Sequence, residues 1–234
     1  MKREPQFKTE ADLCTAFNAW ARKEGWTPYP ETGGWDVLLV AADGTQIGVQ
    51  AKLKFNIKVL AQCLPEHYQG ISGPDFRAVL VPELISEHRQ IAGALGLQCI
   101  YPTHSGRVQD FAPALNTGRH WDGGWHYWNP AKRHPLPAYV PDVPAGASGP
   151  VQLTEWKIKA LRVCAVLEVR GYVTRADFKH YGMDHRRWTG PGGWLVAHEQ
   201  PGAWKWKDGA TGFGPAHPVV YPQILEEVRA ALQK

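Results

Sequence analysis

Apolar side chains in the first part of the chain recur at helical spacing. Leu13, Phe17 and Trp20 follow one another at intervals of four and three residues, which is the period of one face of a helix. Thr9 precedes them with an acidic residue three positions later, the spacing of a capping box. The pattern predicts a helix over about 10–24.

Short apolar runs separated by turn signals predict strands in the rest of the first hundred residues. The segment 28–34 is rich in Pro and Gly and is interpreted as a turn, and Asp43-Gly44 indicates a hairpin. The predicted strands cover residues 35–41, 45–53, 76–82 and 97–102, and the predicted helices between them cover about 56–64 and 86–96. This order predicts an α/β domain over residues 1–104, with a mixed central sheet flanked by helices.

Residues 105–150 show no sustained period of either kind and are dense in Pro, Gly and aromatic side chains. We expect a long irregular connection here, packed by its Trp side chains onto a neighbouring domain and ending in a flexible linker.

Helical spacing returns after residue 150 and predicts a second domain over residues 151–234. A long helix is followed by two short helical segments, and the later one (183–188) has Asp184 as its expected N-cap. WLVAHE and AWKWK then predict a two-stranded ribbon around a Gln-Pro-Gly turn. Three helices and a ribbon predict a small, mainly α-helical domain of the winged helix-turn-helix type, after which a last amphipathic helix follows.

Charge is distributed unevenly between these parts. Residues 1–104 carry ten Lys/Arg against eleven Asp/Glu, whereas residues 151–234 carry twelve against eight, which is a formal charge of −1 against +4. A polyanionic partner is therefore expected at the C-terminal domain.

The spacing of the cysteines and the lengths of the apolar runs indicate the cellular compartment in which we expect the protein. Four cysteines stand far apart, and no pair has the spacing of a zinc knuckle or a redox motif. The chain starts without the apolar run of a signal peptide, and no stretch reaches the length of a membrane span. We therefore expect a cytoplasmic protein with reduced thiols and no membrane partner.

One group of polar residues is brought together by the predicted hairpin. Asp36 stands at the start of one strand, and Gln50 and Lys52 stand two apart on the next, so that their side chains leave the same face. Glu10 lies at the start of the preceding helix. The Asp36 carboxylate, the Gln50 side-chain oxygen and the Ala51 backbone carbonyl are hard oxygen ligands that suit Mg²⁺ or Mn²⁺. Since Lys52 can orient an attacking water or stabilise developing charge, the pattern predicts metal-assisted hydrolysis of phosphodiester bonds.

The order Glu10, Asp36 and Gln50-x-Lys52 on helix, strand and strand resembles the PD-(D/E)XK nuclease superfamily, in a Q-x-K variant of its motif. The resemblance covers roughly residues 8–102 and implies a core in the order α-β-β-β-α-β. It implies that Asp36 is the metal-binding aspartate, Lys52 the catalytic lysine and Glu10 an accessory helix glutamate. The activity that it implies is that of a Mg²⁺-dependent DNA nuclease.

Gln50 departs from the acidic residue that most members of this superfamily carry. The amide removes one negative charge and is expected to weaken metal affinity. Three functions therefore stay open: a metal-dependent DNA endonuclease, a catalytically inactive nuclease-fold protein that binds DNA or regulates, and an interaction protein within a larger complex. Taken singly, Lys52 also fits the polar face of an edge strand, and Glu10 fits a helix N-terminus.

Basic residues of the C-terminal domain are expected to contact DNA. In a helix-turn-helix the later helix enters the major groove, and other basic residues bind phosphate. The expected DNA contacts are Lys54 and Lys58 after the motif, Lys179, His185, Arg186 and Arg187 on the short helices, and Lys205 and Lys207 on the ribbon. A protein-docking domain is the alternative, so that DNA, a protein partner or a second copy of the chain are the expected partners.

Overall fold

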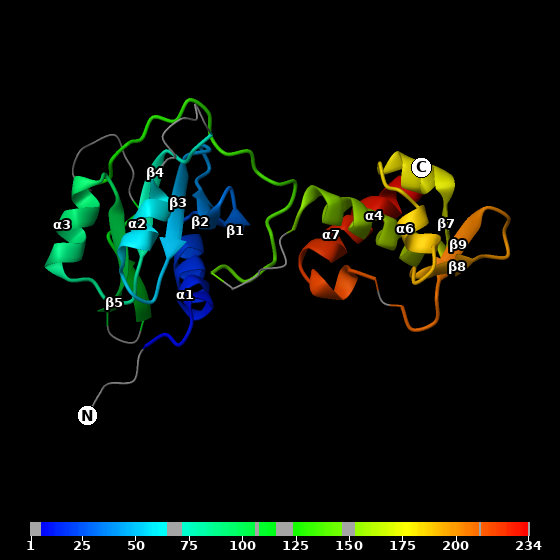
Figure 1. Cartoon of the computed structure of the whole chain (residues 1–234), viewed down its shortest axis with the longest axis horizontal. Coiled ribbons are helices and arrows are strands. Elements are labelled where there is room, and N and C mark those ends of the chain that lie inside the picture. The colour runs from blue at the N-terminus through cyan, green and yellow to red at the C-terminus, as the bar shows by residue number, and fades with distance from the viewer. Residues whose placement is uncertain are drawn as a thin grey trace. The chain divides into compact units, whose positions relative to one another are not determined.

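The computed structural model describes residues 6–64, 72–105, 108–115, 124–146, 153–210 and 212–233 (Figure 1). The chain divides into two compact units, Met1–Val151 and Gln152–Lys234. Each unit has its own sheet and its own buried apolar residues. In the described part of the chain, no helix combines the length and the apolar character needed to cross a membrane.

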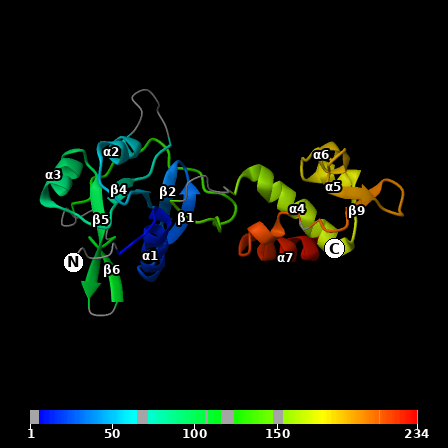
Figure 2. The ribbon, with the colours of Figure 1, turned by 60° about the horizontal axis from the view of Figure 1, so that its bottom comes forward.

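A six-stranded mixed sheet forms the centre of the N-terminal unit. Its elements are α1 (Glu10–Lys23), β1 (Thr27–Thr32), β2 (Trp35–Val40), β3 (Gln46–Ala51), α2 (Ile57–Cys63), β4 (Phe76–Leu80), α3 (Ser86–Ala94), β5 (Gln98–Ser105) and β6 (Val108–Ala112). The strand order is β1-β2-β3-β4-β5-β6. Strands β1 to β3 pair antiparallel, β3-β4 and β4-β5 pair in parallel, and β5-β6 is an antiparallel hairpin (Figure 2). This is the predicted α/β unit, and its first six elements follow the order α-β-β-β-α-β.

Alternate residues of β2 pack into opposite layers of this unit. Val37 and Leu39 lie in the cluster that contains Phe17 of α1, whereas Leu38 lies in the cluster that contains Val59 of α2. Because successive side chains of a strand point to opposite faces, α1 covers one face of the sheet and α2 covers the other. A strand covered on both faces is apolar at nearly every position, which explains the run WDVLLV.

Strand β1 occupies residues that were predicted to form a turn. Pro28 pairs with Leu39, and Pro30 pairs with Val37. Proline has no N–H to donate, so it occurs in strands at sheet edges, and β1 is an edge strand. Pro28 and Pro30 therefore made the sequence of β1 resemble a turn, although it forms an edge strand. Strand β6, at the opposite edge, lies in the stretch that was predicted to be irregular.

The described part of the long connection packs on the N-terminal unit itself. Trp128 Nε1 donates to the carbonyl of Gly96 at 3.2 Å, and the Arg77 guanidinium lies 4.3 Å from the centre of a Trp128 ring. Arg133 Nε donates to Asp75 Oδ2 at 2.7 Å. These side-chain contacts hold the segment against the sheet without regular secondary structure of its own.

The C-terminal unit has a small three-stranded antiparallel sheet with helices around it. Its elements are α4 (Glu155–Arg170), β7 (Val173–Thr174), α5 (Arg175–His180), α6 (Arg186–Thr189), β8 (Leu195–Ala197), β9 (Ala203–Trp206), the 3₁₀ helix η2 (Gly214–Ala216) and α7 (Val220–Leu232). The strand order is β7-β9-β8. Helix α7 lies along α4 (Figure 2), and Tyr221 Oη donates to Glu168 Oε2 at 2.7 Å. Three helices and the predicted ribbon, β8-β9, follow one another, and β7 adds a third strand that was not predicted.

Aromatic side chains form much of the core of this unit. The rings of Phe178 and Trp188 are buried, and their centroids lie 5.5 Å apart. Helix α6 begins at Arg186 and has His185 as its N-cap, so the prediction of Asp184 as N-cap was wrong by one residue. Asp184 still accepts a hydrogen bond from Arg186 N at 3.0 Å, because the turn before α6 brings its carboxylate back to that amide.

Candidate functional site

The β2-β3 hairpin and helix α1 bring the predicted site residues together. Asp36 is the second residue of β2, and Gln50 and Ala51 end β3. Because the two strands pair antiparallel, the start of β2 lies beside the end of β3. Helix α1 lies against both strands and carries Glu10 in its first turn.

Three hydrogen bonds give this cluster its shape. Asp36 Oδ2 accepts a hydrogen bond from Ala51 N at 2.8 Å. Lys52 Nζ donates to Glu10 Oε2 at 2.7 Å. The backbone N–H of Lys52 donates to the carbonyl of Leu80 at 2.9 Å, which fixes the end of β3 to β4. The side chains of three separate elements therefore converge at the end of β3.

Gln50, the residue that departs from the acidic motif, is almost completely buried. It is 5 % exposed, and its Nε2 donates to the carbonyl of Gly34 at 2.8 Å. This bond uses the amide nitrogen and does not involve the side-chain oxygen. An amide oxygen of this kind is a suitable neutral ligand for a hard cation.

Burial raises the pKa of Asp36, and the neighbouring Glu10 carboxylate raises it further. The Ala51 N–H and the Lys52 ammonium oppose the rise without cancelling it. The ionised form of Asp36 is therefore costly in the free protein. A cation bound beside this carboxylate would reduce that cost.

Glu31 belongs to the same cluster and was not predicted. It stands at the end of β1 between the register pairs Pro30–Val37 and Thr32–Trp35, so it lies beside the start of β2 on the neighbouring strand. Burial raises the pKa of Glu31, and so does the charge of Asp36. The signal that could have found Glu31 is the Gly33-Gly34 turn, which folds β1 back beside the start of β2 and so brings the acid near Asp36.

The backbone of Glu31 has φ 49°, in the left-handed region that non-glycine residues rarely adopt. Its Oε1 accepts a hydrogen bond from Gly146 N at 2.8 Å. A Cβ on Gly146 would lie 3.1 Å from Cys14 Sγ and 3.3 Å from the Glu10 backbone. The end of the long connection thus lies directly against the first turn of α1 and the acidic cluster.

The cluster combines several carboxylates with one ammonium. Glu10, Glu31 and Asp36 supply three carboxylates around the single ammonium of Lys52. No three His, Cys, Asp or Glu side chains within the described ranges stand close enough to hold a metal by themselves. The predicted ligand set still fits Mg²⁺ or Mn²⁺, because it combines one carboxylate with an amide oxygen and the Ala51 carbonyl, all hard oxygen donors.

The residues predicted to contact DNA lie at the surface of both units. Lys54 and Lys58 are exposed on the segment that follows β3. In the C-terminal unit Lys179, Arg186, Arg187, Lys205 and Lys207 are exposed, and His185 is half-buried. Trp204 and Trp206 are half-buried and alternate with the two ribbon lysines, as the alternation of a strand requires.

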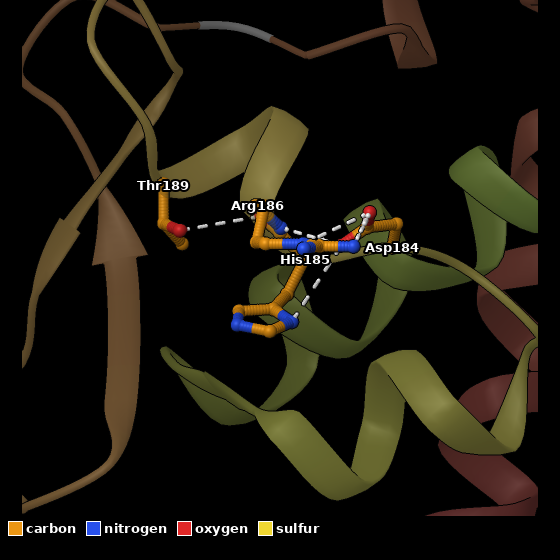
Figure 3. A network of polar contacts seen from close by, with 4 residues as sticks. All are labelled: Asp184, His185, Arg186 and Thr189. Carbon is orange, nitrogen blue, oxygen red and sulfur yellow. Dashed lines mark hydrogen bonds and ion pairs between the residues drawn. The ribbon is translucent and has the colours of Figure 1, made fainter.

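The turn before α6 carries the most connected part of this basic surface (Figure 3). The His185 ring lies 5.3 Å from the Trp204 ring and 6.2 Å from the Phe178 ring, which packs it between α5 and the ribbon. Arg186 forms an ion pair with Asp184, and its hydrogen bonds lower the pKa of that carboxyl to about 2. A basic residue that was not predicted, Arg175, is exposed at the start of α5.

Comparison of the chain with models of protein families, with curated proteins and with solved structures finds no match.

Proposed function

We propose that the protein is a metal-dependent DNA nuclease, in which the N-terminal unit hydrolyses phosphodiester bonds and the C-terminal unit contacts DNA. The observation that carries the proposal is that Glu10, Asp36 and Lys52 lie close together at the end of β3, with Lys52 held 2.7 Å from Glu10. These residues come from a helix and two strands in the order of the PD-(D/E)XK motif. They share one small region although 42 residues of sequence separate Glu10 from Lys52.

The chain's own groups have distinct parts in this reaction. Asp36, the Gln50 amide oxygen and the Ala51 carbonyl would hold Mg²⁺ or Mn²⁺, which supplies Lewis-acid activation of the phosphate and of a water molecule. Lys52 stabilises the negative charge that develops on the phosphoryl oxygens. Glu10 keeps the Lys52 ammonium in place through their direct contact. Burial keeps the cluster partly desolvated, which strengthens each of these interactions.

The composition of the C-terminal unit supports DNA as the partner. Its formal charge is +4, from twelve Lys/Arg and eight Asp/Glu in residues 151–234, and its predicted contact residues reach the surface. One site of this kind cuts one strand, so cleavage of both strands would require a second copy or another protein.

A cytoplasmic location suits the four cysteines, all of which are free and buried.

A catalytically inactive nuclease fold is the second candidate, and Gln50 favours it. The neutral amide replaces a charge, and its nitrogen is already bound to the carbonyl of Gly34. In such a protein the cluster would stabilise the fold, and the protein would act by binding DNA or a partner.

Cleavage assays with matched variants separate the two candidates. Supercoiled, linear and single-stranded DNA are incubated with Mg²⁺ or Mn²⁺ and with wild-type protein, Asp36→Asn, Lys52→Met or the control Lys23→Met. Lys23 is exposed in the last turn of α1, at the other end from Glu10. We expect cleavage by the wild type and the control and none by the two site variants. Absence of cleavage, or cleavage that survives both site substitutions, would reject the nuclease.

A further inference from the structure

The C-terminal unit has an open pocket of about 940 Å³ on the surface formed by α5 and the turn before α6. Four side chains that can carry positive charge line it: Arg175, Lys179, His185 and Arg186. They come from both helices and from the turn between them. A concave surface with this charge suits a polyanion with closely spaced negative groups.

One acidic side chain, Asp184, also lines the pocket. Its Oδ1 accepts hydrogen bonds from Arg186 N at 3.0 Å and from Arg186 Nε at 3.1 Å. Its Oδ2 accepts from Arg186 Nε at 3.2 Å and from Arg186 Nη2 at 2.9 Å (Figure 3). The carboxylate thus occupies the two-pronged face of the guanidinium, which is the face that binds phosphate. His185 Nδ1 lies 3.9 Å from the same carboxylate.

We propose that this pocket binds the phosphodiester backbone of DNA, and that Asp184 occupies the Arg186 side chain in the free protein as an internal competitor. The proposal rests on the DNA contact proposed above and adds its regulation. When a phosphate enters the pocket, the ion pair between Asp184 and Arg186 breaks and Arg186 binds the phosphate. The Asp184 carboxylate then lies beside the bound strand. The pair therefore lowers affinity for DNA below the value that the four basic side chains would give alone.

The exposure of the pair makes the exchange feasible. The Arg186 side chain is 81 % exposed and that of Asp184 is 45 % exposed. Water and salt screen ion pairs at such positions, so their net stabilisation is small. Phosphate contact gains in addition from the release of counterions that are condensed on the DNA. A weak internal pair can thus be displaced, yet it lowers the occupancy of the pocket at every DNA concentration.

Asp184→Asn tests the competitor directly. The amide oxygen can still accept the Arg186 N–H, so the turn keeps its hydrogen bond while the charge is removed. Glu226→Gln is the matched control: it removes one charge from an exposed carboxylate of the same unit that is also paired with an arginine, Arg229, on α7. Arg186→Ala and the double variant Asp184→Asn/Arg186→Ala complete a cycle that isolates the coupling between the two residues.

Binding of a short fluorescein-labelled DNA duplex is measured by anisotropy without divalent cations, at about 50 and about 200 mM salt. We expect Asp184→Asn to bind about threefold to tenfold more tightly than wild type, with a salt slope that is steeper by about one ion. Arg186→Ala should weaken binding, and the double variant should bind no better than Arg186→Ala. The Glu226→Gln control should stay within about twofold of wild type, because its charge lies outside the pocket.

Several results would overturn the proposal. The first is that Asp184→Asn binds DNA as tightly as wild type or less tightly, and the second is that Glu226→Gln gains as much affinity as Asp184→Asn. The third is that Asp184→Asn still raises the affinity when Arg186 is replaced by Ala. The fourth is that no form of the protein binds DNA. The first three leave the proposed nuclease untouched, because DNA cleavage with Asp36→Asn and Lys52→Met judges it separately. Absence of DNA binding would also count against the DNA contact proposed for the C-terminal unit.

Discussion

The Lys52 ammonium lies 2.7 Å from the Glu10 carboxylate and so connects the end of β3 to the first turn of α1. Both side chains are about three-quarters buried, at 25 % and 28 % exposure. We expect Lys52→Met to slow DNA cleavage about 100-fold or more, because it removes the charge that stabilises the transition state. Glu10→Gln keeps an oxygen that can accept from Lys52, and it should slow cleavage about tenfold. Single-turnover rates check both values, and equal losses in the two variants would contradict the separate parts assigned to them.

Asp36→Asn is expected to stabilise the N-terminal unit while it abolishes cleavage. Burial raises the pKa of Asp36, so its ionised form opposes folding at neutral pH. The asparagine oxygen can still accept the Ala51 N–H, which keeps the local hydrogen bond. Hydrogen exchange in urea, followed by peptide, measures the stability of this unit at about pH 7. A loss of stability would mean that the carboxylate serves the fold instead of a ligand.

Glu31 is expected to hold the end of the long connection through its hydrogen bond to Gly146. Glu31→Ala removes the acceptor, and amide exchange at Gly146 should accelerate about fivefold, as the loss of a bond worth about 1 kcal/mol requires. Glu31→Gln keeps an acceptor and should leave the exchange rate close to wild type. Exchange measured by NMR distinguishes the two. Equal acceleration in both variants would show that charge, and not the hydrogen bond, holds Gly146.

Gly48 permits the packing of Trp35 on the neighbouring strand. A Cβ at Gly48 would lie 2.3 Å from the Trp35 ring. We expect Gly48→Ala to destabilise the N-terminal unit by about 1–3 kcal/mol through overpacking. Beyond its own stretch of helix α3, Gly93 has no described atom within 4 Å of such a Cβ, and Gly93→Ala should stabilise by about 0.5–1 kcal/mol. Urea unfolding of both variants measures the contrast, and equal effects would contradict the packing argument.

Acid should weaken the C-terminal unit through Asp177. Although burial favours its protonated form, hydrogen bonds from Thr174 and Arg170 lower its pKa below the usual 3.8. A carboxyl with a lowered folded-state pKa stabilises the fold above 3.8, and this contribution is lost as the pH falls through the folded pKa. Asp177→Asn should therefore be less stable than wild type at about pH 6, and the difference should shrink as the pH falls below 3.8. Hydrogen exchange of α5 in urea checks this, and an undiminished difference in acid would exclude the charge as its cause.

Much of the N-terminal unit could be predicted because its signals are local. The capping box at Thr9 is formed within α1, and Asp43-Gly44 marks the turn between β2 and β3. Once that hairpin is recognised, Asp36 must lie beside the end of β3, so the core of the candidate site follows from the order of elements. Glu31 was missed because Pro28 and Pro30 weaken the strand signal of β1, and only pairing with β2 makes that strand evident.

By itself the sequence determined the class of the fold, the order of most elements, the basic character of the C-terminal unit and the residues that could form a metal site. Helical spacing, caps and turns depend on residues only a few positions apart, so they can be recognised from a short stretch of sequence. Only the tertiary structure decided that Lys52 pairs with Glu10, that Gly146 binds Glu31 and that Asp184 occupies Arg186. These pairings depend on which segments pack together and on the exact side-chain positions that result. The burial of each charged group, and its distance from other charges, follow from that packing.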